Sequence, residues 1–183
     1  MTESIAEAIV LVGPMGAGKT SIGRRVAREL GVPFTDTDSL VVRDHGPIAQ
    51  LFATYGEACF REAERAAVQE ALARGGVVAL GGGAVLDAET RRDLAAQPVV
   101  LLTVAPHVVR GRIHGDSRPL LAEGEDPVTR WESILASRSE LYSEVADVTF
   151  DTSTGPLSHI VSDIVSWFRT YTDDSGDPAE ENA

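Results

Sequence analysis

A glycine-rich segment, GPMGAGKT at residues 13–20, follows directly on the apolar run 8–12. It fits the pattern G-x-x-x-x-G-K-[S/T], in which glycines let backbone N–H groups turn inward around phosphate oxygens. An amphipathic helix is expected over 20–30, because the apolar residues there recur every four positions. The buried strand, the loop and the helix together predict a P-loop, which is a cradle for nucleotide phosphates.

The P-loop pattern assigns roles to individual residues. Lys19 is placed to reach the β- and γ-phosphates, and the Thr20 hydroxyl is suited to ligate Mg²⁺. The dinucleotide pattern G-x-G-x-x-G is excluded, because its last glycine is missing here. The residues expected to bind ATP from this segment are Gly16, Ala17, Gly18, Lys19, Thr20 and Ser21.

Further apolar runs of strand length alternate with helical patterns along the chain. The expected strands are 33–35, 77–80, 99–104 and 148–150, and the expected helices are 57–74, 87–96, 131–141 and 157–168. Unbroken apolar strands alternating with helices predict a five-stranded parallel sheet between two helical layers, an α/β sandwich of three layers. Ligands bind beyond the carboxyl ends of such strands, so the residues that follow each strand are the candidates for a site.

The length of 183 residues fits one domain, expected over residues 1–172. The segment 113–126 is rich in glycine, proline and charge and is expected to be a loop. The final segment, 173–183, is acidic and poor in apolar residues, and is expected to be a disordered tail.

Composition excludes several classes of function. The net charge of −12 argues against binding of nucleic acid, whose phosphates need Lys and Arg. The single cysteine, Cys59, excludes an intramolecular disulfide and a cysteine zinc cluster. Neither a signal peptide nor a membrane span is expected, because no long apolar run is present. We therefore expect a cytoplasmic monomer that binds small molecules.

The carboxylate expected to assist Mg²⁺ does not follow the apolar strand 77–80, where other P-loop proteins carry it. In motor-type ATPases it ends a hydrophobic strand, but the run 77–80 ends in three glycines, residues 81–83. Asp36 and Asp38 follow the strand 33–35 and could face Mg²⁺ or an acceptor hydroxyl. The simpler alternative is that they cap a helix. Which of the two would take a hydroxyl proton stays open.

Four further motifs, in order along the chain after the P-loop, resemble those of shikimate kinases. They are Asp36-Thr37-Asp38, Phe60-Arg61-x-x-Glu64, Leu80-Gly81-Gly82-Gly83-Ala84-Val85 and Arg118-Pro119-Leu120-Leu121. The resemblance covers roughly residues 8–170. It implies a P-loop NTPase fold like that of nucleoside monophosphate kinases, with a lid over 113–126. It also implies transfer of the γ-phosphoryl group of ATP to the 3-hydroxyl of shikimate, in aromatic amino-acid biosynthesis.

On the acceptor side, the resemblance implies that Asp38 holds the shikimate hydroxyls and that Gly82 offers its backbone N–H. Arg61 and Arg138 would clamp the carboxylate, a role that suits the planar guanidinium fork. Each arginine also has a simpler interpretation as a solvated charge on a helix. Glu64 is either a partner that orients Arg61 or a surface charge.

On the nucleotide side, the resemblance implies that Asp36 acts on Mg²⁺ through water and that Arg118 in the lid closes over ATP. The family often has a basic residue after its last strand, near the adenine, but the segment 151–156 has none. We therefore expect Arg112, or alternatively Arg110, to stack on the adenine.

The implied catalytic residues are Lys19, Asp38 and Arg118, acting by positioning and charge neutralisation. Two other functions stay open at this point. One is another small-molecule P-loop kinase, such as a gluconate kinase, whose substrate is also a polyhydroxy carboxylate. The other is a nucleotide-sensing regulatory protein that binds ATP and transfers nothing.

Overall fold

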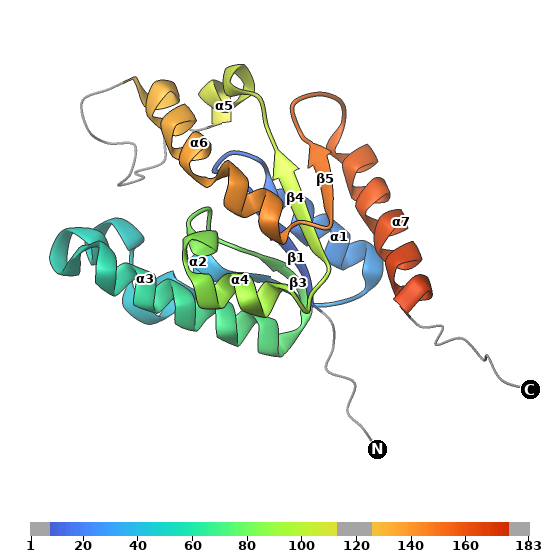
Figure 1. The fold of residues 1–183 in the computed structure, drawn as a ribbon, viewed down its shortest axis with the longest axis horizontal. Coiled ribbons are helices and arrows are strands. Elements are labelled where there is room, and N and C mark those ends of the chain that lie inside the picture. Colours follow the sequence, from blue (N-terminus) through green and yellow to red (C-terminus); the bar gives the residue numbers. More distant parts are fainter. Residues whose placement is uncertain (1–7, 113–125, 176–183) are drawn as a thin grey trace, which may run out of the picture.

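The computed structural model describes residues 8–112 and 126–175 of the chain. Its strands form one parallel sheet in the order β2-β3-β1-β4-β5 (Figure 1). The strands are β1 (Ala8–Val12), β2 (Phe34–Asp36), β3 (Gly76–Ala79), β4 (Val99–Thr103) and β5 (Val148–Asp151). The predicted five-stranded parallel sheet is confirmed, with strand ends shifted by one residue or so from the apolar runs.

Eight helical segments lie between and after these strands in the described part of the chain. They are α1 (Lys19–Leu30), α2 (Thr37–His45), α3 (Ile48–Arg74), the 3₁₀ turn η1 (Ala84–Leu86), α4 (Ala88–Leu94), α5 (Pro106–Arg112), α6 (Pro127–Val145) and α7 (Leu157–Ser175). None of the helices in these ranges is long and apolar enough to cross a membrane.

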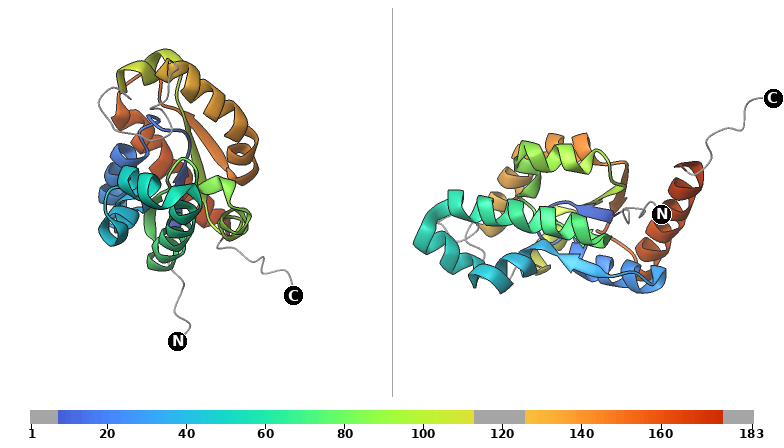
Figure 2. Two further views of the ribbon diagram at one scale, coloured as in Figure 1. Left: turned by 90° about the vertical axis from the view of Figure 1, so that its left-hand side faces the viewer. Right: turned by 90° about the horizontal axis from the view of Figure 1, so that it is seen from below.

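The core consists of two apolar layers, one on each face of the sheet. In β1, Ile9 and Leu11 face the layer that includes residues of α1 and α7, whereas Val10 and Val12 face the layer that includes residues of α2 and α3. Figure 2 shows helices on both sides of the sheet. All residues of β1 and β3 are buried, which explains why their sequences are unbroken apolar runs. The predicted three-layer α/β/α sandwich is therefore confirmed.

Helix α3 begins earlier than the predicted start at residue 57. Its helical assignment runs through Gly56, whose φ of 81° and ψ of 176° are not helical, so two helices meet there at a kink. Glycine reaches this region of positive φ without a Cβ penalty. The predicted helix over 57–74 corresponds to the second of these parts.

Helices α2 and α5 were not predicted, and α7 continues past the predicted end at residue 168. In α7, the ring of Tyr171 lies over that of Trp167, with centroids 5.2 Å apart, so the aromatic side of the helix continues for another turn. The helix ends at Ser175 and thus includes the first residues of the segment 173–183 that was predicted as a tail. The rest of that segment lies outside the described residues.

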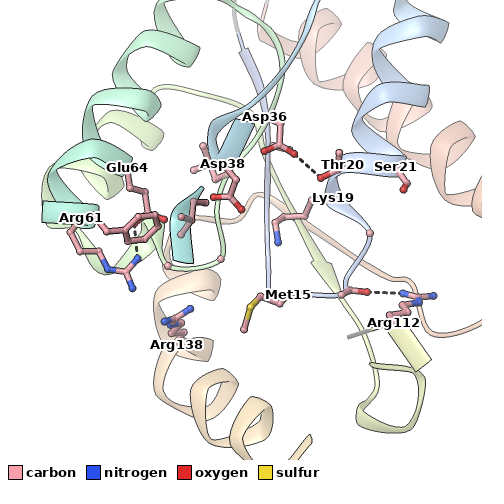
Figure 3. A pocket seen from close by; sticks show the side chains of 18 of the residues that line it. Met15, Lys19, Thr20, Ser21, Asp36, Asp38, Arg61, Glu64, Arg112 and Arg138 are labelled. Carbon is pink, nitrogen blue, oxygen red and sulfur yellow. Dashed lines mark hydrogen bonds and ion pairs between the residues drawn. The ribbon is translucent and has the colours of Figure 1, made fainter. Parts of the chain in front are cut away.

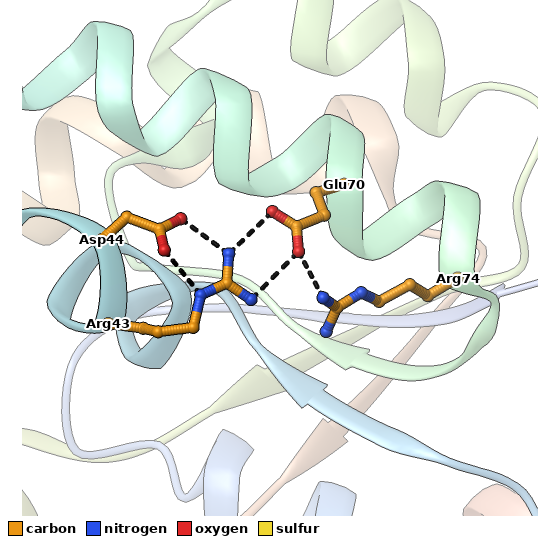
Figure 4. Close-up of polar contacts among 4 residues, drawn as sticks. All are labelled: Arg43, Asp44, Glu70 and Arg74. Atoms are coloured by element: carbon orange, nitrogen blue, oxygen red, sulfur yellow. Dashed lines mark hydrogen bonds and ion pairs between the residues drawn. The ribbon is translucent and has the colours of Figure 1, made fainter.

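A surface network of charged side chains connects α2 with α3 (Figure 4). Arg43 of α2 donates from Nη1 and Nη2 to the carboxylate of Glu70 on α3, at 3.1 and 3.0 Å. It also bonds the neighbouring Asp44, and Arg74 pairs with the same Glu70. Water and salt screen exposed pairs of this kind, so they contribute little to stability. Buried apolar residues of α2 and α3 also pack in the same core layer.

The strand order brings three loops together at one edge of the sheet. β1 lies between β3 and β4, and β2 pairs with β3 on its other side. The P-loop after β1, the glycines 81–83 after β3 and the residues after β2 therefore meet at the carboxyl ends of neighbouring strands.

Candidate active site

A cleft of about 640 Å³ opens at this edge and contains most of the predicted site residues (Figure 3). Figure 3 shows Arg61 and Arg138 toward one end of the cleft and Arg112 toward the other, with Lys19 between them. The predicted residues among its lining are Gly16, Gly18, Lys19, Thr20, Ser21, Asp36, Asp38, Arg61, Gly82, Arg112 and Arg138. Ala17 is the exception in the P-loop, because its side chain is buried in the core.

The P-loop has the shape that the sequence predicts. Gly13 has a φ of 139°, and a Cβ on it would lie 2.2 Å from the carbonyl oxygen of Leu102, so only glycine fits there. Gly18 precedes α1 with a left-handed φ of 91°. The Nζ atom of Lys19 donates to the carbonyl oxygens of Gly13 and Pro14, at 2.7 and 3.0 Å. The ammonium group thus bends back over the loop, into the space that the backbone encloses.

Thr20 and Asp36 meet between the P-loop and the end of β2. The Thr20 hydroxyl donates to Asp36 Oδ2 at 2.7 Å, while Asp36 Oδ1 accepts from the backbone N–H of Ser39 at 3.3 Å. Asp36 is therefore the N-cap of α2, as in the simpler interpretation, and it is also a neighbour of the P-loop hydroxyl. A hydroxyl and a carboxylate are hard oxygen ligands, and Mg²⁺ often takes one or two such protein groups and completes its shell with phosphates and water. The pair fits that ion.

The glycine loop after β3 lets charged side chains approach its backbone closely. The N–H of Gly81 donates to the buried hydroxyl of Thr37 at 2.9 Å. A Cβ at Gly81 would lie 2.5 Å from Asp38 Oδ1 and 2.8 Å from Glu64 Oε1. Glycine at this position is thus required for the two carboxylates to occupy the wall of the cleft.

Arg61 is held by two glutamates of its own helix. Its Nη1 donates to Glu64 Oε2 at 2.6 Å, and its Nη2 donates to Glu57 Oε1 at 3.0 Å. The guanidinium also lies over the Phe60 ring, 5.1 Å from the centroid. Because the Glu64 side chain is only 5% exposed, Glu64 is a buried partner of Arg61 and not a surface charge. Burial raises the pKa of Glu64, although Arg61 opposes that shift.

Helix α6 carries a buried arginine into the same cleft. Arg138 is 7% exposed and lines the cleft, so it is not the solvated helix charge of the simpler interpretation. Its surroundings include Glu64 and Tyr142. Burial raises the pKa of both groups, and the positive charge of Arg138 opposes both shifts. Arg138 therefore lies among the groups that also surround Arg61.

Sequence reasoning missed two contacts of α6. The Trp131 ring N–H donates to the carbonyl oxygen of Met15 in the P-loop at 2.9 Å, and the Tyr142 hydroxyl donates to the carbonyl oxygen of Gly82 at 2.5 Å. The spacing of Trp131, Arg138 and Tyr142, seven and then four residues apart, places all three on one side of a helix and was the available signal.

Of the two arginines considered for the adenine, Arg112 lines the cleft. Its Nη1 donates to the carbonyl oxygen of Gly16 at 2.9 Å, and its Nη2 donates to the carbonyl oxygen of Thr152 at 3.0 Å. It thereby connects the P-loop with the segment after β5, where no basic residue occurs. Arg110 instead forms an ion pair with Asp126 at the start of α6, with 3.6 Å between Arg110 Nη1 and Asp126 Oδ1. Arg118 and the predicted lid, apart from Asp126, lie outside the described residues.

Comparison with known proteins identifies one family. The family model described as "Shikimate kinase" matches residues 15–169. A shikimate kinase of Corynebacterium diphtheriae is 41% identical over 172 residues, which cover 93% of this chain and 99% of that protein. One of Frankia casuarinae is 49% identical over 148 residues, which cover 79% of this chain but only 65% of its own, longer length.

Solved structures agree with that match. The shikimate kinase from Acinetobacter baumannii in complex with shikimate has a TM-score of 0.85 and 36% identity, and the match covers 91% of this chain and 94% of that one. A gluconokinase from Sinorhizobium meliloti has a TM-score of 0.62 at 22% identity, covering 93% and 95% of the two chains. At this identity the gluconokinase is evidence for the fold alone.

Proposed function

The chain belongs to the shikimate kinase family, and on this premise we propose that it transfers the γ-phosphoryl group of ATP to the 3-hydroxyl of shikimate. The products are shikimate 3-phosphate and ADP, in the synthesis of chorismate and the aromatic amino acids. One observation carries the proposal for this chain. A single cleft has the phosphate cradle with Lys19 on one side, and Asp38, Arg61 and Arg138 on the other.

The nucleotide half of the cleft is the P-loop with its flanking residues. ATP phosphates would bind to the backbone N–H groups of 16–18 and to Lys19, which would exchange its carbonyl partners for phosphate oxygens. Ser21 follows in the first turn of α1, and the guanidinium of Arg112 supplies a flat cationic face for the adenine. Arg118 enters the proposal as a lid residue through the family resemblance alone.

The Thr20 hydroxyl would hold Mg²⁺, and Asp36 would hold it through water. Support comes from their oxygen atoms, which lie 2.7 Å apart beside the phosphate cradle. Mg²⁺, when bound, supplies charge neutralisation of the β- and γ-phosphates.

The acceptor half would recognise a polyhydroxy carboxylate. Arg61 and Arg138 would offer their guanidinium groups to the carboxylate of the acceptor. Glu64 holds Arg61 in place by accepting a hydrogen bond from its Nη1. Asp38, in the first turn of α2, faces the hydroxyls, and Gly82 offers its backbone N–H.

The reaction follows from this arrangement as an in-line displacement. The acceptor hydroxyl oxygen bonds to the γ-phosphorus while the bond to the bridging β–γ oxygen breaks, and ADP leaves. Asp38 would orient the acceptor hydroxyl before transfer and take its proton. Lys19 remains on the transferring phosphoryl group, so the contribution of the protein is positioning and charge stabilisation.

A coupled assay of ADP release, run with shikimate, gluconate and other sugar acids, tests this function. We expect Mg²⁺-dependent ADP formation that requires shikimate, with Lys19→Ala as the control for contaminating ATPase. Turnover on gluconate with none on shikimate would overturn the proposed acceptor. Binding of ATP with no acceptor-dependent ADP release would instead indicate the regulatory protein considered from the sequence.

A further inference from the structure

The glycine loop of residues 81–83 must keep one conformation to serve as a binding surface, although its sequence opposes this. Glycine has the largest backbone freedom of any residue, so three in succession need restraint from their surroundings. The three positions differ in the space around them. A Cβ at Gly82 would meet its neighbours at ordinary contact distances, none below 3.6 Å, whereas a Cβ at Gly81 or Gly83 would collide with a charged side chain.

Hydrogen bonds restrain the loop. The carbonyl oxygens of Gly81 and Gly83 accept from the backbone N–H groups of Ala84 and Leu86, at 3.1 and 3.0 Å, within the turn itself. The carbonyl oxygen of Gly82 accepts from the hydroxyl of Tyr142, 60 residues away on α6. Gly82 thus depends on a side chain of another element for the direction of its carbonyl group.

Tyr142 is built into the fold as a fixed donor. Tyr142 is 2% exposed and packs in the core layer on the α3 side of the sheet. Burial raises the pKa of its hydroxyl, which therefore keeps its proton and continues to donate at neutral pH. The 2.5 Å distance to the Gly82 oxygen leaves no room for a water between them.

Tyr142 and Arg138 lie four residues apart on α6, one above the other on the same side of the helix. Arg138 faces the cleft, and Tyr142 holds the loop that forms the neighbouring wall. One rigid helix therefore sets the position of a guanidinium and of the Gly82 backbone relative to each other.

We propose that Tyr142 is a positioning residue for the acceptor: its hydroxyl fixes the Gly82 backbone at the distance and direction from Arg138 that a hydroxylated carboxylate requires. This inference rests on the proposed function only in that the acceptor is taken to be shikimate. Tyr142 is not among the residues that line the cleft, so the proposed role is positioning and includes neither contact with the acceptor nor proton transfer.

Tyr142→Phe tests the proposal, because it keeps the ring in the core and removes only the hydroxyl. A buried hydrogen bond contributes enough for its loss to change an equilibrium by about 2- to 12-fold. We expect the KM for shikimate to rise by about five- to tenfold and the KM for ATP to change by less than twofold. Tyr171→Phe on α7, remote from the cleft, is the matched control and should leave both values unchanged.

The KM values separate positioning from a merely structural role. A loss of folded protein lowers the apparent kcat but does not change KM, since KM is independent of the concentration of active enzyme. A shikimate KM that stays within twofold of the wild-type value, or an ATP KM that rises equally, would overturn the inference. Failure of the proposed function is distinguishable, because the wild-type protein itself would then show no shikimate-dependent turnover.

Discussion

The guanidinium of Arg61 and the carboxylate of Glu64 form an ion pair, with 2.6 Å between Nη1 and Oε2. Their side chains are 22% and 5% exposed, so the pair lies largely out of water at the edge of the cleft. A surface pair would contribute little, whereas breaking a buried pair leaves an uncompensated charge. Glu64 therefore holds one end of the guanidinium, and the exposed Glu57 accepts from its Nε and Nη2.

Replacing Arg61 by lysine should weaken shikimate binding far more than ATP binding. Lysine keeps the charge but loses the planar fork, so it cannot bond Glu64 and a substrate carboxylate in the same geometry. Loss of one charge-assisted hydrogen bond, about 1.5–3 kcal/mol, corresponds to a rise in the shikimate KM of about 10- to 150-fold. The measurement is the pair of KM values, with circular dichroism as the control for folding. If neither KM changes, Arg61 is not part of the acceptor site.

The buried carboxylate of Glu64 should make the stability of the protein depend on pH. Burial raises its pKa above the ordinary value of 4.5, so the folded state binds this proton more tightly than the unfolded state. The stability that Glu64 contributes is therefore complete below pH 4.5 and is lost as the pH rises through the raised folded pKa.

Glu64→Gln isolates this effect, because glutamine does not titrate. We expect the free energy of unfolding of the variant, minus that of the wild type, to increase with pH above about 4.5 and then to level off. Urea unfolding of both proteins between about pH 4 and 8 measures the difference. A difference that is constant or decreases over this range would contradict a raised pKa.

The sequence predicted those parts of the fold that local pattern determines. The P-loop could be predicted because its glycines, its lysine and the strand before it form one contiguous signal. The strands could be predicted because both faces of the central sheet are buried, which makes their sequences apolar throughout. Helix α2 was not among the expected helices, although capping of a helix by Asp36 was considered as the alternative to a site role, and Asp36 does cap it.

Other features of the cleft depend on contacts between residues that are far apart in the sequence, and local pattern does not predict these. Arg138 has serines on both sides and Glu140 two positions on, so its local sequence is that of an exposed helix. Its burial follows from where α6 packs, which the local pattern does not contain. The same holds for the hydrogen bond of Tyr142 to Gly82, which joins two elements 60 residues apart.

Gly83→Ala should impair the acceptor site through Arg61. The backbone of Gly83 has a φ of −98°, which alanine adopts without strain, so the only cost is the added Cβ. That atom would lie 2.2 Å from Arg61 Nη1 and would force the guanidinium away from Glu64. We expect the shikimate KM to rise by about tenfold or more, as for loss of a charge-assisted hydrogen bond, while the ATP KM stays within about twofold.

Gly111→Ala on α5 is the control for Gly83→Ala, because nothing lies within 4 Å of a Cβ at that position. Alanine should be neutral or slightly stabilising there, since it favours a helix over glycine by about 1 kcal/mol. Comparable rises of the shikimate KM in both variants would show that the collision with Arg61 is not the cause.

Trp131 provides an optical test of the nucleotide half of the cleft. The chain has two tryptophans, and Trp131 is the one whose ring N–H bonds the Met15 carbonyl in the P-loop. Trp167 lies on α7, where its ring packs against Tyr171. In a Trp167→Phe variant the emission therefore comes from Trp131 alone, and phosphates bound on the P-loop would change the electrostatic field at its indole.

We expect ATP or ADP to change the fluorescence of Trp167→Phe in a saturable manner. The reciprocal variant, Trp131→Phe, keeps the distant indole and should show little change. It should also have a higher KM for ATP, by about 2- to 12-fold, because the Met15 carbonyl loses a buried hydrogen-bond donor. Titration of both variants with nucleotide, under identical Mg²⁺ concentrations, measures the two signals. An equal response from both variants would mean that Trp131 does not report on the P-loop, and an unchanged ATP KM in Trp131→Phe would mean that its hydrogen bond does not position the loop for nucleotide.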